Sequence, residues 1–344
     1  MKKIALLLTV SLSFAAIEFS GDARYRPRYD VKKHDSSGVA DVSDFYYLYR
    51  ARINMKADIG DGWFFSAKLG TNDVAGMTTM SPGDVWEGPG NPNSSRPNVS
   101  FLELYYGYAQ ENKGLWVGAF PLKYTPAYDL HFYSDKLVDI PWVLNNNGSV
   151  TGISGYKIYN NKKFNWFLSI DENNINLSTN GNGVKTEQKD KYTFGLNSKT
   201  EIFNLSITNN LLFSFGDGDL PTTYGIDIGL PKFSQISSNI LYHISSNDIY
   251  DADHFRFLLT RPMNNGSIKF FYDIANNDDN SMSYVWLSYT HLCYKGDLGS
   301  VTITPTYRYQ NGGTIDIPHT DGIQVFDKNY TRSKFEITTE IKFK

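Results

Sequence analysis

The sequence predicts an all-β protein, a closed antiparallel transmembrane β-barrel of about 16 strands. Three observations predict it. The 344 residues are 15% aromatic, yet the mean hydropathy is -0.38 and no apolar run reaches 18 residues, which excludes a bundle of membrane-spanning helices. Many segments alternate apolar and polar side chains with the period of a β-strand. Finally, the connections between these segments are alternately short and long, as in transmembrane barrels.

The first residues predict export from the cytoplasm. Lys2 and Lys3 precede an apolar stretch at 4–10, and the small residues Ser13 and Ala15 form a cleavage pattern. We therefore expect residues 1–15 to be a signal peptide and residues 16–344 to form one barrel domain. Without the peptide, 31 basic residues face 36 acidic ones, a mild negative balance that argues against a nucleic-acid partner. Because Cys293 is the only cysteine, an intrachain disulfide is excluded.

Three segments alternate most clearly. In 17–31, the odd positions from Ile17 to Val31 are mainly apolar, and the even positions from Glu18 to Asp30 are polar or charged. The segments 45–59 and 335–343 repeat this pattern. Each is predicted to turn its apolar face to lipid and its polar face to water.

The other predicted strands alternate less regularly, above all 150–160, 223–231 and 282–294, so the strand number is expected to lie between 14 and 18. They are 63–72, 99–109, 115–123, 150–160, 164–173, 191–201, 203–215, 223–231, 233–245, 254–261, 267–275, 282–294 and 299–310. Aromatic residues near several strand ends are predicted to form a ring at the membrane interface: Trp63, Phe65, Tyr106, Tyr108, Trp116, Phe164 and Trp166.

The connections predict which ends of the strands share a side of the membrane. Tight turns are expected at 60–62, 110–114, 161–163, 262–266 and 295–298. Longer loops are expected at 32–44, 73–98, 124–149, 174–190 and 311–329, with shorter ones at 216–222, 246–253 and 276–281. The sheet must close, because unpaired backbone groups in hydrocarbon cost several kcal/mol each. An even number of strands places both chain ends on the short-turn side.

The polar face of the first two strands is rich in cations. We expect Arg24, Arg26, Arg28, Arg50, Arg52 and Lys56 to line the lumen, a 16-strand barrel being wide enough to hold water. A register that pairs Glu18 with Asp58 would place Arg24 opposite Arg52 and Arg26 opposite Arg50, and like charges across a ladder destabilise it. Carboxylates expected on the lumen wall are Asp22, Glu103, Glu336 and Glu340.

Taken end to end, the chain resembles a Gram-negative outer-membrane porin. The stretches 24–30 and 49–54, together with 118–122 before a long loop, resemble the major outer-membrane porins of the Campylobacter type. The resemblance implies a channel for passive diffusion of small hydrophilic solutes and ions, not an enzyme. It implies an outer-membrane location with periplasmic turns and extracellular loops, contacts with lipid and lipopolysaccharide, and a homotrimer. The last strand would guide the barrel-insertion machinery, although Lys344 after Phe343 departs from the usual aromatic end.

The resemblance also implies that the third long loop, 124–149, folds into the lumen and narrows it. Its acidic residues Asp129, Asp135 and Asp139 would then face the basic wall across the passage. A second interpretation stays open, in which the arginines pair with the wall carboxylates and stiffen the barrel.

Two alternatives to a general channel stay open. One is a substrate-preferring porin, with Tyr46, Phe64 and Tyr105 as an aromatic track for sugars, or the arginines as a track for organic acids. The other is a β-rich carbohydrate-binding protein or hydrolase, secreted or in the outer membrane.

No cofactor is expected, because the six histidines show no metal-ligand spacing. Acidic loop residues offer oxygen ligands for Ca²⁺, although such clusters are more often solvated turns. They are Asp217, Asp219, Asp248, Asp251, Asp253, Asp278 and Asp279.

Overall fold

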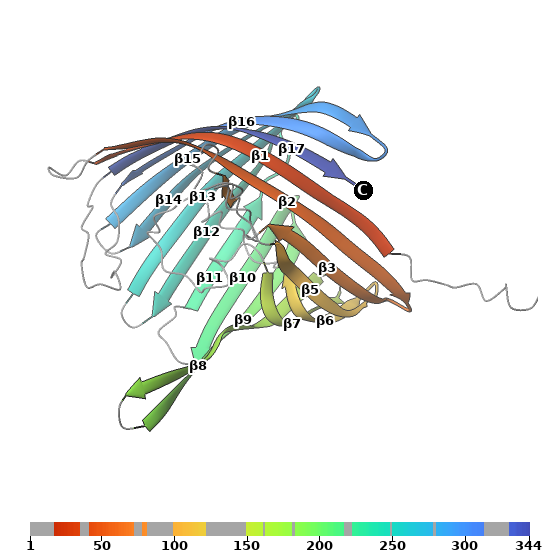
Figure 1. The fold of residues 1–344 in the computed structure, drawn as a ribbon. Helices are drawn as coiled ribbons and strands as arrows, with labels where there is room; N and C mark the ends of the chain where they lie inside the picture. Colours follow the sequence, from red (N-terminus) through yellow and green to blue (C-terminus); the bar gives the residue numbers. More distant parts are fainter. Residues whose placement is uncertain are drawn as a thin grey trace, which may run out of the picture.

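The protein is an antiparallel β-barrel in a computed structural model (Figure 1). The structure describes residues 17–34, 41–71, 78–80, 99–121, 149–160, 162–180, 183–216, 222–247, 250–277, 280–312 and 330–344. The predicted signal peptide and almost all of the predicted third loop, with Asp129, Asp135 and Asp139, lie outside these residues.

All 16 predicted strands are present, including the three that alternate poorly. The strands are β1 (Ile17–His34), β2 (Val42–Gly60), β3 (Trp63–Thr71), β4 (Thr78–Met80), β5 (Val99–Ala109), β6 (Lys113–Pro121), β7 (Ser149–Tyr159), β8 (Lys162–Asn180), β9 (Gly183–Ile202), β10 (Leu205–Gly216), β11 (Thr222–Gly229), β12 (Ser237–Asn247), β13 (Tyr250–Met263), β14 (Gly266–Asn277), β15 (Asn280–Gly296), β16 (Gly299–Gly312) and β17 (Tyr330–Phe343).

The sheet closes because the first and last strands pair. β1 lies between β2 and β17, and every other wall strand pairs with its neighbours along the chain. The short β4 pairs with β2 at Tyr47–Tyr49, beyond the point where β3 has ended, so β3 and β4 share one place and the ring has 16 places. Closure removes the two free edges that an open sheet would have at its first and last strands.

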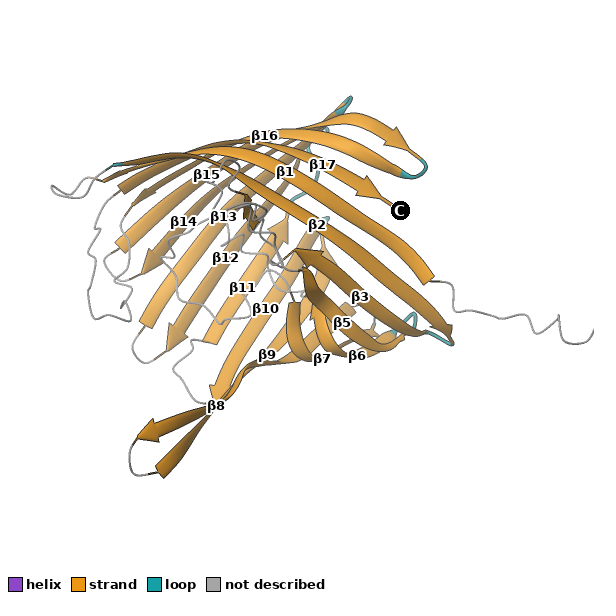
Figure 2. Ribbon diagram, in the orientation of Figure 1, coloured by secondary structure: helices purple, strands orange, loops and turns teal. Residues whose placement is uncertain are grey.

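The two faces of the sheet differ as the alternation predicts. Phe19, Ile53 and Phe335 are each about half exposed on the outer face, whereas Asp22, Arg50 and Glu336 on the inner face are buried. The described residues form strands, turns and bends only (Figure 2). None of them belongs to a helix long and apolar enough to cross a bilayer.

Tight turns join the strands at the end of the barrel where β1 begins and the chain ends (Figure 1). Between β2 and β3, Asp61 and Gly62 have φ of 53° and 84°. Positive φ at both central residues matches the twist of the flanking strands, and Gly adopts it without strain. Phe203 and Asn204 make a similar turn between β9 and β10.

Two predicted long loops contain strands. The predicted loop at 73–98 includes the short β4. Residues 174–190 continue β8 and β9 as a hairpin that projects from the barrel (Figure 1), with pairing from Asn174–Lys189 to Asn180–Gly183. The segment lacks apolar alternation, so its polar composition suggested a loop. Two predicted shorter loops also shrink, because β12 ends at Asn247 and β13 begins at Tyr250, while β14 ends at Asn277 and β15 begins at Asn280.

Candidate functional site: the lumen wall

The register of β1 and β2 decides which charges meet, and the predicted register is wrong by two residues. Asp22 lies opposite Arg52, and Arg24 lies opposite Arg50. The prediction failed because the connection between these strands is long, and only a tight turn would fix the pairing from the sequence. The shift places Asp22 opposite Arg52 and leaves one arginine pair across the ladder, Arg24 with Arg50, in place of the two expected.

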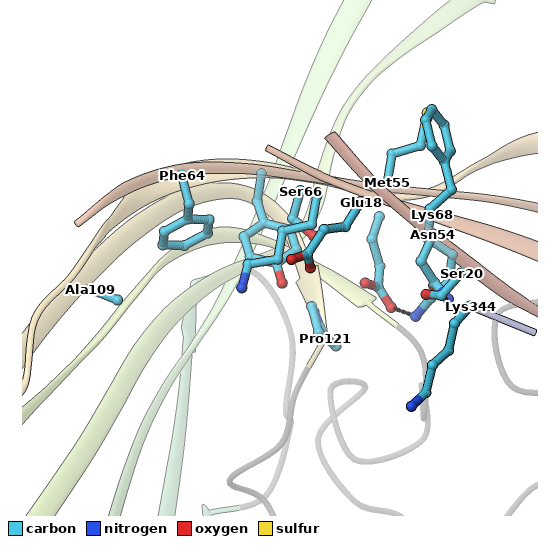
Figure 3. Close-up of a pocket in the computed structure, with 14 residues that line it drawn as sticks. Glu18, Ser20, Asn54, Met55, Phe64, Ser66, Lys68, Ala109, Pro121 and Lys344 are labelled. Atoms are coloured by element: carbon cyan, nitrogen blue, oxygen red, sulfur yellow. Dashed lines mark hydrogen bonds and ion pairs between the residues drawn. The ribbon is translucent and has the colours of Figure 1, made fainter. Parts of the chain in front are cut away.

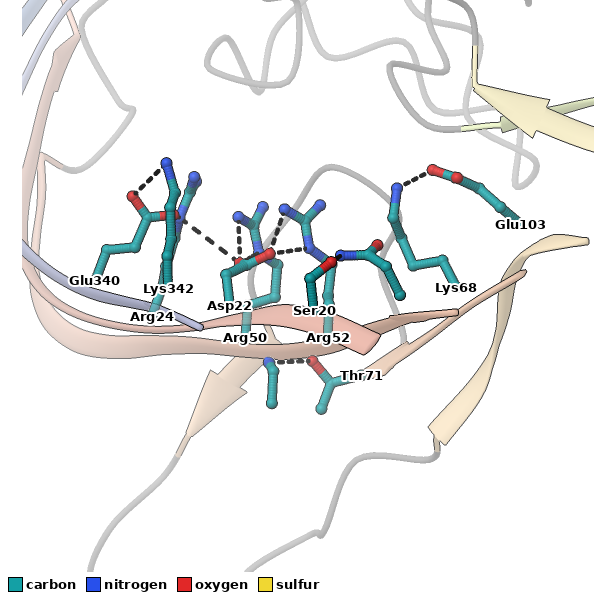
Figure 4. Close-up of polar contacts among 12 residues, drawn as sticks. Ser20, Asp22, Arg24, Arg50, Arg52, Lys68, Thr71, Glu103, Glu340 and Lys342 are labelled. Carbon is teal, nitrogen blue, oxygen red and sulfur yellow. Dashed lines mark hydrogen bonds and ion pairs between the residues drawn. The ribbon is translucent and has the colours of Figure 1, made fainter. Parts of the chain in front are cut away.

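Asp22 holds both arginines of β2 (Figure 4). Its Oδ1 accepts from Arg50 Nη2 at 2.8 Å, and its Oδ2 accepts from Arg52 Nη2 at 2.7 Å and Nε at 2.8 Å. Arg24 Nε lies 4.0 Å from the same carboxylate. One buried anion therefore organises three cations, with geometry that suits the guanidinium fork.

The last strand supplies the next carboxylate. Arg24 Nε donates to Glu340 Oε1 at 2.6 Å, and Lys342 Nζ lies 3.5 Å from Glu340 Oε2. These side chains project to the same side of the sheet as Asp22 (Figure 4). The first and last strands, which closure predicts to be neighbours, are thus joined by an ion pair as well as by backbone hydrogen bonds.

Glu336 lies at the centre of a second group. Its side chain is 1% exposed. Arg28 Nε donates to Glu336 Oε2 at 2.8 Å, Arg26 Nε lies 3.7 Å from Oε1, and Arg308 of β16 donates to Oε1. Arg26 also donates to Thr338 Oγ1 at 2.7 Å. Removal of this one carboxylate would leave the buried Arg308 and the partly buried Arg26 and Arg28 without their shared anion.

Asp30 extends the array towards the long-loop end. It accepts two hydrogen bonds of 2.8 Å from Arg332 and one of 3.1 Å from Tyr46 Oη, and Lys334 Nζ lies 3.7 Å away. Tyr46 in turn accepts from Arg28 Nη1 at 3.1 Å, which links the Asp30 and Glu336 groups. Tyr46 is thus part of the charged array.

The remaining predicted lumen residues lie nearer the tight turns. Lys68 of β3 pairs with Glu103 of β5, directly opposite on the ladder. Lys56 lies opposite Glu18 and lines the same cavity as that ion pair. Of the four wall carboxylates, Asp22, Glu336 and Glu340 pair with arginines, as the second interpretation expects, whereas Glu103 pairs with a lysine.

The sequence did not single out a further ion-pair group on β13 and β14. Arg256 donates to both oxygens of Asp273 at 2.7 Å, and His254 Nε2 lies 3.8 Å from Asp273 Oδ2. His243 lies opposite His254 on the β12–β13 ladder, and both are buried. The available signal was the alternation of Arg256 and Asp273 with apolar neighbours.

At mid-wall, the opposite part of the ring carries neutral polar groups. The charged Lys163, Lys199 and Asp227 lie on the same face of these strands, nearer the tight turns. Asn165, Asn197 and Asn210 form a chain of amide hydrogen bonds across β8, β9 and β10, at 3.0 and 2.5 Å. Hydroxyl pairs continue it, with Thr193 and Ser214 at 2.8 Å and Thr223 and Ser245 at 2.7 Å.

Within the described part of the chain, no group of three His, Cys, Asp or Glu side chains could hold a metal ion. Most of the acidic loop residues considered for Ca²⁺ lie outside it. Asp253 is described, and its carboxylate accepts two hydrogen bonds of 3.2 Å from Asn276.

Solved structures share this architecture. The anion-selective porin from Comamonas acidovorans has 13% identity and a TM-score of 0.56, covering 94% of this chain and 99% of that one. A mutant of the Rhodopseudomonas blastica porin has 11% identity and a TM-score of 0.56, covering 95% and 100%. OmpT, an outer-membrane protein of Vibrio cholerae in a trimer form, has 10% identity and a TM-score of 0.53, covering 95% and 99%.

Neither a protein-family model nor a curated protein matches the sequence. The structural likeness extends over almost the whole of each chain, whereas the sequences have diverged to about one identical residue in eight or fewer. The chain therefore has the 16-strand barrel fold of outer-membrane porins.

Proposed function

We propose that this protein is a porin of the Gram-negative outer membrane, a water-filled channel through which small hydrophilic solutes and ions diffuse passively. One observation carries the proposal: a closed ring of 16 places with large apolar side chains exposed outside and charged side chains inside. Such an outer face suits hydrocarbon, and such an inner face suits water. A closed ring with an apolar outer face does not fit a secreted carbohydrate-binding protein or hydrolase, which the sequence left open.

Planar-bilayer recording tests the channel. Purified, folded protein should insert and give stepwise increases in conductance in KCl. Folding is checked independently by a shift in electrophoretic mobility on heating and by β-sheet circular dichroism. Folded, membrane-inserted protein without any conductance would refute the channel.

The finer part of the proposal is that the lumen wall of β16, β17, β1 and β2 attracts anions. Near mid-wall, six arginines surround only three carboxylates: Arg24, Arg26, Arg28, Arg50, Arg52 and Arg308 around Asp22, Glu336 and Glu340. Carboxylate pairing thus offsets half of this positive charge. We further propose that the 124–149 loop, with Asp129, Asp135 and Asp139, narrows the passage beside this wall.

Reversal potentials in a salt gradient test the basic wall. The variant with Arg24, Arg26, Arg50 and Arg52 all replaced by Ala should shift selectivity towards cations, because four positive charges leave the lumen. Lys33→Ala is the control, since this exposed lysine follows the outward-facing Val31 on β1. Unchanged potentials in the fourfold variant would contradict the role of these arginines.

The outer face is proposed to contact lipid and lipopolysaccharide, the last strand to guide insertion, and three copies to form the native unit. The exposed apolar side chains of β17, including Phe335 and Phe343, support the lipid contact. Cross-linking in native membranes should give a trimer band if the assembly forms, and only monomer bands if it does not.

A further inference from the structure

A cavity of about 890 Å³ lies on the lumen side of β1, β2, β3 and β5 (Figure 3). We propose that it is a binding subsite for a neutral, polyhydroxylated ring, the chemistry of a sugar. The inference rests on the proposed channel function, because a solute reaches this wall through the lumen. The volume lies within the roughly 300–1,000 Å³ that is usual for small-molecule sites.

Two aromatic side chains provide an apolar surface in the cavity. Phe64 of β3 and Tyr105 of β5 lie edge to face, with ring centroids 5.8 Å apart and an interplanar angle of 79°. Both are only partly buried and line the cavity, so a ligand can reach them. The C–H face of a sugar ring packs on such a surface, whereas a small inorganic ion gains nothing from it.

Paired charges surround the rings. Lys68 and Glu103 form an ion pair, and Glu18 lies opposite Lys56 across the β1–β2 ladder. The ammonium groups of Lys56 and Lys68 thus each have a carboxylate in the same lining, and Lys344 adds a third ammonium group at its edge. The cavity therefore offers both donors and acceptors, which is what hydroxyl groups require.

The same pairing decides against a charged ligand. An anion attracted by Lys56 and Lys68 would be repelled by the carboxylates of Glu18 and Glu103. A cation attracted by these carboxylates would in turn be repelled by the two lysines. The amide of Asn54, which donates to Ser20 Oγ at 3.3 Å, adds a neutral polar group to the lining. A neutral ring with many hydroxyls satisfies both the aromatic and the polar parts of the cavity.

Current blocking by sugars in planar bilayers tests the subsite. Glucose and maltose should reduce the KCl current reversibly and in a concentration-dependent manner. Phe64→Ala and Tyr105→Ala should each weaken this block by about two- to tenfold, because each removes part of the aromatic surface. Phe101→Ala is the matched control, since Phe101 lies on β5 but is 58% exposed on the outer face, and its block should equal that of the wild type.

Three results would overturn the subsite: no block by either sugar, the same block in all variants, or a stronger block by glucuronate than by glucose. A separate measurement keeps this outcome distinct from failure of the channel. Saturation-transfer NMR with glucose, on barrel folded in a detergent without sugar headgroups, requires no conductance. Transfer to glucose that falls in Phe64→Ala supports the subsite even in a closed barrel, and no transfer overturns it.

Discussion

The lumen wall is built differently in two regions that face one another. On β16, β17, β1 and β2, arginines surround buried carboxylates such as Asp22 and Glu336. Around β8 to β12, Asn165, Asn197, Asn210 and short hydroxyl side chains bond to one another across adjacent strands. In the closed ring of 16 places, β10 is the place opposite β1.

The difference shows that one barrel can satisfy its inward polar groups in two ways, with neutral hydrogen bonds in one region and with ion pairs in the other. Short amides and hydroxyls satisfy one another and place no net charge in the lumen. Arginines satisfy their carboxylates yet outnumber them, so positive charge is concentrated in the first region. Between low-dielectric walls, such an arrangement should give a potential that falls from the charged region to the neutral one.

The largest effect is expected where one carboxylate serves several cations. Glu336→Gln should destabilise the barrel by about 3 kcal/mol, because it leaves the buried Arg308 and the partly buried Arg26 and Arg28 without their shared anion. The midpoint of urea unfolding in detergent measures this. Glu340→Gln should cost less, since its carboxylate is 13% exposed and holds a single arginine. Equal losses in the two variants would show that sharing does not matter.

Asp22→Asn should sharpen the electrostatic difference between the two regions. It leaves Arg50 and Arg52 uncompensated and should increase the anion-to-cation permeability ratio by roughly two- to fivefold at low salt, consistent with a charge interaction of about 1 kcal/mol in water. The effect should shrink as KCl rises, because salt screens it. A shift towards cations would contradict a wall that attracts anions.

How far the sequence predicts this structure depends on the kind of information required. Period-two alternation places each strand and its faces, because successive side chains point to opposite sides, so Arg50 and Glu340 were expected on the inner face. Pairing of first and last strands follows from closure. Trp116, expected at the outer membrane interface, instead faces inward and is buried, since it alternates with the exposed Val117.

Other features depend on the register between neighbouring strands, which alternation does not determine. A register error of two residues keeps every face correct, and so the pairing of Asp22 with Arg52 was not visible. The hairpin at 174–190 was missed because strands outside the hydrocarbon need no apolar face, although the sequence Asn-Gly-Asn-Gly at 180–183 was a usable hairpin signal. The Arg256–Asp273 pair likewise needed the register of β13 and β14.

A moderate effect is expected in the neutral region. Asn197→Ala should cost about 1–2 kcal/mol of unfolding free energy, because it breaks the amide chain between Asn165 and Asn210. Ion selectivity should not change, since no charge is lost. Ser198→Ala, on the outer side of the same strand, is the control and should have a smaller effect on stability. A change of selectivity in Asn197→Ala would contradict the prediction that only the arginine-rich region determines ion selectivity.

The smallest effect is expected from the projecting hairpin above the neutral region. β7 pairs with β8 only up to Ile170, and β10 pairs with β9 only up to Lys191, so within the described residues 174–180 and 183–189 pair only with each other. Two-stranded ribbons contribute little stability by themselves. Replacing residues 174–189 by Asn-Gly, which suits a two-residue turn between Asn173 and Asp190, should change the unfolding free energy by less than about 0.5 kcal/mol. Conductance and selectivity should also persist, because the amide chain at Asn197 lies in the part of β9 that the deletion leaves intact. A marked loss of stability would mean that the neutral region of the wall requires the projecting hairpin for its stability.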